Sequence, residues 1–298
     1  MAAALAAGLI VGALGTTGAT AMARPVHSAA VGQSEGPCEW LAQGRLKYPT
    51  AGEQRVTFAV ADAYRQTEVV LTSCVRTDDG GYAQEWDSAA FAGSAGFGRP
   101  GLIEVDSLMS PTGSFTVTEA FGREDPGTGL AYNTLRRDSY WGANAGETFN
   151  QYFEGNGAWP DEDLWRFMRS GLYEQAAVIN YNRLPDMQPV AGASHAIFLH
   201  AGFEETWGCI STDLGTVTRY LRTAAPGDRF VMGVRDALFD PPSPHPSSGA
   251  PAERETTGSG QASTRTTGGW GLAALAGGGL ALLGGLVFAA VRKRGQAR

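Results

Sequence analysis

The sequence contains few cysteine and histidine residues, with three cysteines and four histidines among 298 residues. His27 and His245 lie near the two ends of the chain, which leaves His195 and His200 in its central part. Structural zinc sites usually take four Cys or His ligands at characteristic spacings. The residues present do not supply such a set, and we predict no metal site.

Motifs for nucleotides and nucleic acids are also missing. There is no Walker loop, no Rossmann glycine pattern and no paired Cys-x-x-Cys. The formal net charge is -7, and no basic patch stands out, which excludes nucleic acid as an expected partner.

Both ends of the chain have the composition of segments outside a globular domain. Residues 1–23 are almost wholly small or apolar and end in Ala19-Thr20-Ala21, the small-x-small pattern of a signal peptide. No Lys or Arg precedes this apolar run, so an uncleaved anchor is the alternative. Residues 270–291 carry no charge and are long enough for a transmembrane helix. The basic residues in 292–298 predict a cytoplasmic tail and an extracytoplasmic domain held at the membrane.

Residues 237–269 are rich in Pro, Ser, Gly and Thr and predict a disordered stalk. The folded part then runs from about Cys38 to Asp240, which suits one domain. Within it we place a lead-in over 24–51 and the main domain over 52–236.

The odd number of cysteines leaves one thiol over. In an oxidising exterior, Cys38 and Cys74 are expected to form a disulfide, with two free thiols as the alternative. Cys209 then needs a separate explanation, which is either catalysis or an inert buried position.

Short segments of alternating or β-branched residues predict a mainly β domain. One helix is predicted over 161–170, and a second is predicted to start at Ser211 or Thr212, just after Cys209. The predicted strands are 55–61, 68–75, 82–86, 114–119, 177–181, 195–200 and 229–234.

The strand ending at His200 and the helix after Cys209 suggest a pair of catalytic groups. A helix N-terminus lowers a thiol pKa, and a nearby imidazole accepts the proton. The N–H groups of Trp207 and Gly208 could bind the oxyanion of a tetrahedral intermediate. A His and a Cys at the spacing of His200 and Cys209 also occur together by chance. We expect a structural role for His195, because its side chain faces away from that of His200.

Two stretches carry a family resemblance. His195-Ala-Ile-Phe-Leu-His200 followed by Thr206-Trp-Gly-Cys209-Ile-Ser211 resembles the signature of L,D-transpeptidases of the YkuD type, and so does the stretch from Ser110 to Phe115. Trp207 stands where most of the family has His, and Ser211 stands where it has Arg or Asn.

The resemblance implies a β-sandwich or barrel of short strands and a cysteine acyltransferase without metal or cofactor. Cys209 would attack a peptidoglycan stem tetrapeptide, His200 would act as base, and a neighbouring stem amine would resolve the thioester into a 3→3 cross-link. This chemistry belongs to peptidoglycan biosynthesis, cell wall organisation and cell shape. The residues that the resemblance suggests for the substrate pocket are Thr206, Ser211, Gly113 and Phe115.

Two other functions stay open. The same thioester resolved by water would make an L,D-carboxypeptidase or endopeptidase of wall peptides. Alternatively, the domain is a non-catalytic module that binds the cell wall.

Overall fold

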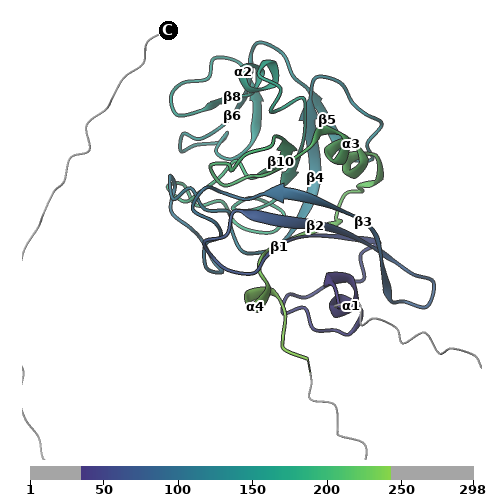
Figure 1. Ribbon diagram of the computed structural model, residues 1–298. Helices are drawn as coiled ribbons and strands as arrows, with labels where there is room; N and C mark the ends of the chain where they lie inside the picture. Colours follow the sequence, from purple (N-terminus) through teal and green to yellow (C-terminus); the bar gives the residue numbers. More distant parts are fainter. Residues whose placement is uncertain (1–34, 243–298) are drawn as a thin grey trace, which may run out of the picture. The chain divides into compact units, whose positions relative to one another are not determined.

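The strands of the chain close into a β-barrel (Figure 1). The computed structural model describes residues 35–242, so the predicted signal peptide, transmembrane helix and cytoplasmic tail lie outside the described residues. A nine-stranded sheet has the order β12-β1-β2-β3-β11-β10-β9-β4-β5, and an additional β12–β4 pairing closes eight of these strands into a ring. The prediction of a mainly β domain is therefore confirmed.

A meander of three long strands forms one wall of the barrel. It consists of β1 (Arg55–Ala61), β2 (Glu68–Arg76) and β3 (Tyr82–Phe91), which pair antiparallel in sequence order. Val and Thr side chains favour these extended segments, and Gly80 has the positive φ (85°) that the β2–β3 turn requires. The predicted strand at 55–61 has the same bounds as β1.

The ring is closed by β4 (Gly113–Gly122) and β12 (Arg229–Val234), which pair antiparallel, while β12 runs parallel to β1. The short β5 (Ala131–Thr134) adds to the other side of β4. The barrel encloses the first core cluster, whose largest members include Leu71, Trp86, Phe115, Ile179, Leu199, Ile210, Tyr220 and Phe230.

The remaining wall holds the segment with the predicted site. It comprises β9 (Gln175–Ile179), β10 (Phe198–Ala201) and β11 (Ile210–Thr212), and β10 and β11 run parallel. The prediction of a strand over 195–200 starts too early, because Ala196 has a φ of 55° and interrupts an extended chain.

The helix predicted just after Cys209 does not begin there. Ser211 and Thr212 belong to β11, and α3 (Leu214–Thr223) starts after Asp213, whose side chain accepts from Thr216 N. A strand thus separates Cys209 from the helix, because Ser211 and Thr212 pair with His200 and Ala201 of β10.

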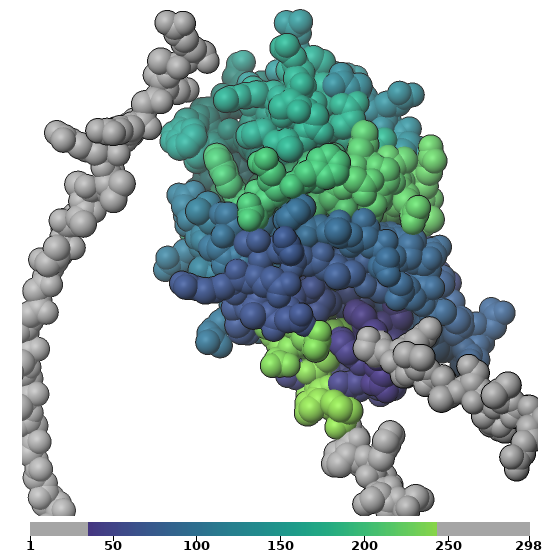
Figure 2. Space-filling model, in the orientation of Figure 1, coloured from purple at the N-terminus to yellow at the C-terminus, as the bar shows by residue number. Residues whose placement is uncertain are grey.

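A smaller layer covers the outer face of β9 and β10. It contains a three-stranded sheet of β6 (Ser139–Trp141), β7 (Tyr152–Glu154) and β8 (Glu162–Asp163), followed by α2 (Leu164–Arg169). The helix predicted over 161–170 is therefore shorter, because Glu162 and Asp163 pair with β6. Figure 2 shows the green part of the chain around residue 200 between the teal part near 150 and the blue part near 75.

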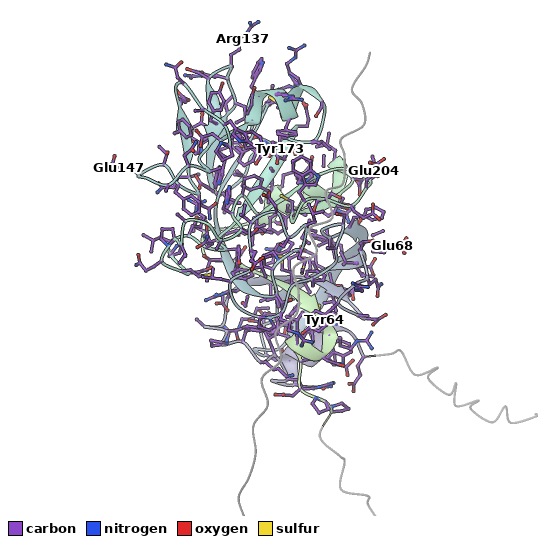
Figure 3. The ribbon with its side chains drawn as sticks, turned by 90° about the vertical axis from the view of Figure 1, so that its left-hand side faces the viewer. Tyr64, Glu68, Arg137, Glu147, Tyr173 and Glu204 are labelled. Atoms are coloured by element: carbon purple, nitrogen blue, oxygen red, sulfur yellow. A yellow bond between two sulfur atoms is a disulfide. The ribbon has the colours of Figure 1, made fainter. Side chains whose placement is uncertain are left out.

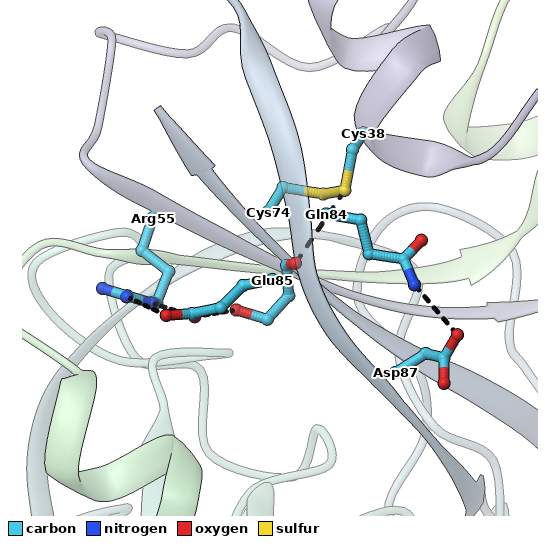
Figure 4. The surroundings of a disulfide bond; sticks show 7 residues. Cys38, Arg55, Cys74, Gln84, Glu85 and Asp87 are labelled. Atoms are coloured by element: carbon cyan, nitrogen blue, oxygen red, sulfur yellow. Dashed lines mark hydrogen bonds and ion pairs between the residues drawn. A yellow bond between two sulfur atoms is a disulfide. The ribbon is translucent and has the colours of Figure 1, made fainter. Parts of the chain in front are cut away.

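The opposite end of the barrel carries α1 (Pro37–Ala42) and α4 (Arg235–Leu238) (Figure 1). Cys38 and Cys74 form a disulfide that joins α1 to β2, beside the ion pair of Arg55 and Glu85 (Figure 4). The folded unit is therefore wider than the predicted 52–236, because α1 and the buried Phe239 pack on the same cluster. Within residues 35–242 no helix is long and apolar enough to span a membrane.

Candidate functional site

His200 lies in β10, and Cys209 directly precedes the neighbouring parallel strand β11. Leu199 pairs with Ile210, and both side chains belong to the core inside the barrel. Because side chains alternate along a strand, His200 and the residue before Ile210 point outward. Cys209 accordingly belongs to the second core cluster, which lies between the barrel wall and the covering layer.

The imidazole of His200 is oriented by the backbone. Its Nδ1 lies 2.7 Å from the carbonyl oxygen of Ala201. A carbonyl can only accept, so Nδ1 carries the hydrogen and Nε2 holds the free lone pair. The residue is 6% exposed, and this burial lowers the pKa of His200 to about 4 against the opposing effect of the Ala201 bond. The imidazole is therefore neutral at pH 7, with Nε2 as the basic atom.

The thiol of Cys209 is also held by backbone groups. Its Sγ donates to the oxygen of Ala196 over 3.2 Å and accepts from the N–H of Phe198 over 3.4 Å. The residue is 9% exposed, and burial together with the nearby Glu162 charge raises the pKa of the Cys209 thiol well above its usual value. The expectation that a helix N-terminus and a hydrogen bond to His200 ionise this thiol is wrong for this structure.

The turn before Cys209 is tightly hydrogen-bonded. Thr206 Oγ1 donates to the Cys209 oxygen over 2.6 Å and accepts from Gly208 N over 3.0 Å. Ser110 Oγ donates to the same Cys209 oxygen over 3.2 Å. The Gly208 N–H proposed for the oxyanion is thus already satisfied, whereas the Trp207 N–H makes no hydrogen bond within residues 35–242. The Trp207 side chain is 84% exposed.

The other predicted pocket residues are only partly brought together. Ser211 shares the face of Cys209, but its hydroxyl donates to the Glu204 oxygen over 2.7 Å. Phe115 packs inside the barrel against Tyr181, with ring centroids 5.5 Å apart. Gly113 lies beneath the Phe115 ring, which a Cβ at this position would meet at 2.6 Å. Phe115 and Gly113 therefore serve the barrel core and do not line the Cys209 face.

His195 lies away from the Cys209 and His200 pair. It precedes β10, and its ring packs on Phe149 with centroids 5.2 Å apart. Within residues 35–242 no group of three His, Cys, Asp or Glu side chains is arranged to hold a metal ion.

Two residues that the sequence did not single out complete the site. The ring of Tyr173 lies edge-on to the His200 ring at a centroid distance of 5.3 Å, and its hydroxyl donates to Glu162 Oε1 over 2.5 Å. Figure 3 places Tyr173 in the interior, whereas Glu147 and Arg137 lie at the rim. Glu162 follows Pro160 and Asp161 as a first helical turn would, so no sequence signal distinguished it.

Burial raises the pKa of the Glu162 carboxyl to about 7, although the Tyr173 hydrogen bond acts in the opposite direction. Burial, and then the charges of Glu162 and Cys209, raise the pKa of Tyr173 well above its usual value. Four titratable side chains thus gather between the barrel wall and the covering layer: Glu162, Tyr173, His200 and Cys209.

One surface groove lies elsewhere. It has a volume of about 760 Å³ and does not include Cys209. Its lining includes Tyr64, Arg65, Phe97, Arg99, Ile103 and Met109.

Comparison with known proteins yields little. No protein-family model and no curated protein matches the sequence. Two solved structures of the helical cell shape determining protein Pgp2 from Campylobacter jejuni, one of them a point mutant, are similar with a TM-score of 0.34 at 13% and 15% identity. The match covers 68% of this chain, and the chain spans 56% of the Pgp2 chain. A similarity at this level carries no argument about function, which therefore rests on the geometry of the site.

Proposed function

We propose that this protein is a cysteine L,D-transpeptidase of the YkuD type that acts on peptidoglycan stem tetrapeptides. The observation that carries the proposal is the placement of the protein's one free thiol within residues 35–242. Cys209 directly precedes β11, the strand that pairs with the strand of His200, and the Ala201 carbonyl holds Nε2 of His200 as the basic nitrogen.

The reaction starts from a neutral thiol and a neutral imidazole. His200 Nε2 takes the thiol proton as Cys209 Sγ attacks the carbonyl after the diamino acid of the stem. The imidazolium then protonates the leaving D-alanine, and a thioester remains. The amine of a second stem attacks this thioester, which forms the 3→3 cross-link and frees the thiol.

The burial of Cys209 sets a condition on this mechanism. Its neighbours in the second core cluster include Trp141, Leu164 and Tyr173 from the covering layer. A stem peptide can reach the sulfur only after some of these side chains move. The closed arrangement also keeps the thiol protonated, and therefore protected from oxidation, until substrate enters.

The proposal assigns the enzyme to peptidoglycan biosynthesis and cell wall organisation outside the cytoplasmic membrane. The disulfide of Cys38 and Cys74 supports this location, because disulfides persist in oxidising compartments. Attachment by a C-terminal membrane helix is part of the proposal and concerns residues outside the described part of the chain.

The test is an intact-mass measurement of the purified protein after exposure to a carbapenem, an acylating agent of the resembled family. We expect one adduct, which is absent in Cys209→Ala. His200→Ala is expected to slow acylation by roughly 10²–10⁴-fold, the usual effect of losing a general base. Dimeric products from synthetic stem tetrapeptides would identify a transpeptidase, whereas trimmed monomers alone would identify the hydrolase.

The burial and raised pKa of Cys209 favour one alternative, a non-catalytic module that binds cell wall. The same measurement separates the two functions. If Cys209 acquires no adduct while the protein still sediments with purified peptidoglycan, the binding module is correct and the enzyme is not.

A further inference from the structure

The Glu162 carboxylate has one oxygen occupied and the other free. Tyr173 donates its hydroxyl to Oε1, and Oε2 makes no hydrogen bond within residues 35–242. No basic side chain of the described chain forms an ion pair with Glu162. Arg183 lies over the neighbouring Trp141 ring at 5.1 Å, but its charge is paired with Glu119.

A carboxylate in this position is expected to bind a positively charged group. Ionised carboxylates in protein-rich surroundings are ordinarily paired, because desolvation of an unpaired charge is costly. Glu162 is half-buried, and its Oε2 is not among the fully buried polar atoms that lack a partner, so solvent can reach this oxygen. Tyr173, which donates to this carboxylate, packs in the same core cluster as Cys209, so Glu162 lies on the side of the thiol.

The proposed function supplies a cation at this place. The nucleophile that resolves the thioester is an amine, which is an ammonium ion at neutral pH and must lose a proton before it can attack. We propose, on the basis of that function, that Glu162 binds the ammonium group of the acceptor stem and takes its first proton, with Tyr173 as the positioning residue that holds the carboxylate.

Each proton of the acceptor ammonium goes to a named group. The ammonium gives one proton to Glu162, and the neutral amine attacks the thioester carbon to form the C–N bond. The nitrogen then gives its second proton to His200 Nε2. The C–S bond breaks, and the imidazolium returns that proton to Cys209 Sγ. Glu162 releases its proton to solvent through its exposed side.

The surroundings favour the first transfer. Burial makes the Glu162 carboxyl a stronger base than an exposed one. The same desolvation lowers the pKa of an ammonium group that enters the site. Tyr173 contacts Glu162 directly, and its ring packs with His200 and in the same core cluster as Cys209. None of them is cationic in the resting protein, so none competes with the acceptor.

The experiment separates thioester formation from its resolution. Glu162→Gln keeps the shape of the side chain and removes the base. Acylation is followed by intact mass with a carbapenem, and resolution by the ratio of cross-linked dimer to hydrolysed monomer from synthetic stem tetrapeptides. We expect Glu162→Gln to be acylated at least as fast as the wild type, because a negative charge near the thiol is removed, and to form dimer roughly 10²-fold more slowly.

The pH profile gives a readout that a structural role would not move. Dimer formation by the wild type should rise as pH increases through about 7, where Glu162 loses its proton. The variant should lack this rise. Tyr173→Phe should weaken the amine-dependent step, through a higher KM for the acceptor stem, while the hydrolysed product continues to form.

Glu154→Gln is the matched control. Glu154 lies in β7 of the same small sheet, and its Oε1 also accepts from a tyrosine hydroxyl, that of Tyr152, over 2.8 Å. Its side chain is 43% exposed, and the Glu154 charge has no part in the state of Cys209. This variant should cross-link as the wild type does.

Two results would overturn the role of Glu162. One is a Glu162→Gln variant that forms dimer at the wild-type rate with the wild-type pH profile. The other is a folded variant that loses acylation as well as resolution, which would place Glu162 in the earlier step. A wild-type protein that is never acylated would instead refute the proposed function itself.

Discussion

The backbone N–H of Phe198 donates to Cys209 Sγ across the junction of β10 and β11, over 3.4 Å. The thiol in turn donates to the Ala196 oxygen, so both of its hydrogen bonds go to the chain that leads into β10. The strand that carries His200 therefore also holds the Cys209 thiol. In this arrangement the imidazole of His200 becomes a partner of the thiol only when the Ala196 contact breaks.

The native thiol should be slow to alkylate. At pH 8 we expect iodoacetamide to modify Cys209 about tenfold or more slowly in the native protein than in denaturant, because burial raises the thiol pKa and closes access. Mass spectrometry of quenched samples measures the rate, with Cys209→Ala as background. Equal rates in the native and unfolded protein would show an open, ionisable thiol and contradict the closed geometry.

Stability should depend on pH through His200. The folded imidazole has a pKa of about 4 and the unfolded one about 6.5, so between these values only the unfolded chain binds this proton. The contribution of His200 is present above pH 6.5 and is lost as pH falls towards 4, by about 3 kcal/mol at most. Urea denaturation at a series of pH values measures it.

Glu162 acts with the opposite sign in an overlapping window. Its folded pKa is raised to about 7, so this carboxyl stabilises the fold at acid pH and loses that effect as pH rises. The contribution of His200 is therefore obtained as the difference in the free energy of unfolding between the wild type and His200→Gln at each pH. His195→Gln, which keeps His200, should retain the wild-type dependence of the free energy of unfolding on pH. A His200→Gln variant with that same dependence would contradict the role of His200.

The turn before Cys209 should depend on the absence of a side chain at Gly208. This residue has a φ of 145°, and a Cβ would lie 3.0 Å from the Met109 oxygen. Gly208→Ala therefore combines backbone strain with a clash against backbone that has little freedom to move. Gly146 has a φ of 147° with no atom within 4 Å of the same Cβ position, which makes Gly146→Ala a control for the strain alone.

We expect Gly208→Ala to reduce the free energy of unfolding by about 1–3 kcal/mol more than Gly146→Ala does. Urea denaturation of both variants gives the difference. Acylation of Cys209 should fall only in Gly208→Ala, because this turn fixes the Cys209 carbonyl. Equal stability losses would mean that the Met109 contact relaxes freely.

The local pattern of residues was sufficient to predict the regular strands. The segments 55–61 and 229–234 were predicted with the bounds of β1 and β12, because Val, Phe and Thr side chains favour extended chain wherever it is placed. The two cysteines that form the disulfide were also selected from the sequence, since three cysteines leave few pairings.

The sequence alone determined that the domain is mainly β, and it selected Cys209 and His200 as the candidate nucleophile and base. Only the tertiary structure decided their surroundings. Ser211 and Thr212 look like helix caps in isolation, but backbone pairing with β10 draws them into a strand and moves the helix away from the thiol. Glu162 and Tyr173 reach the site from β8 and the chain beyond α2, through packing between segments distant in sequence, which no local spacing encodes.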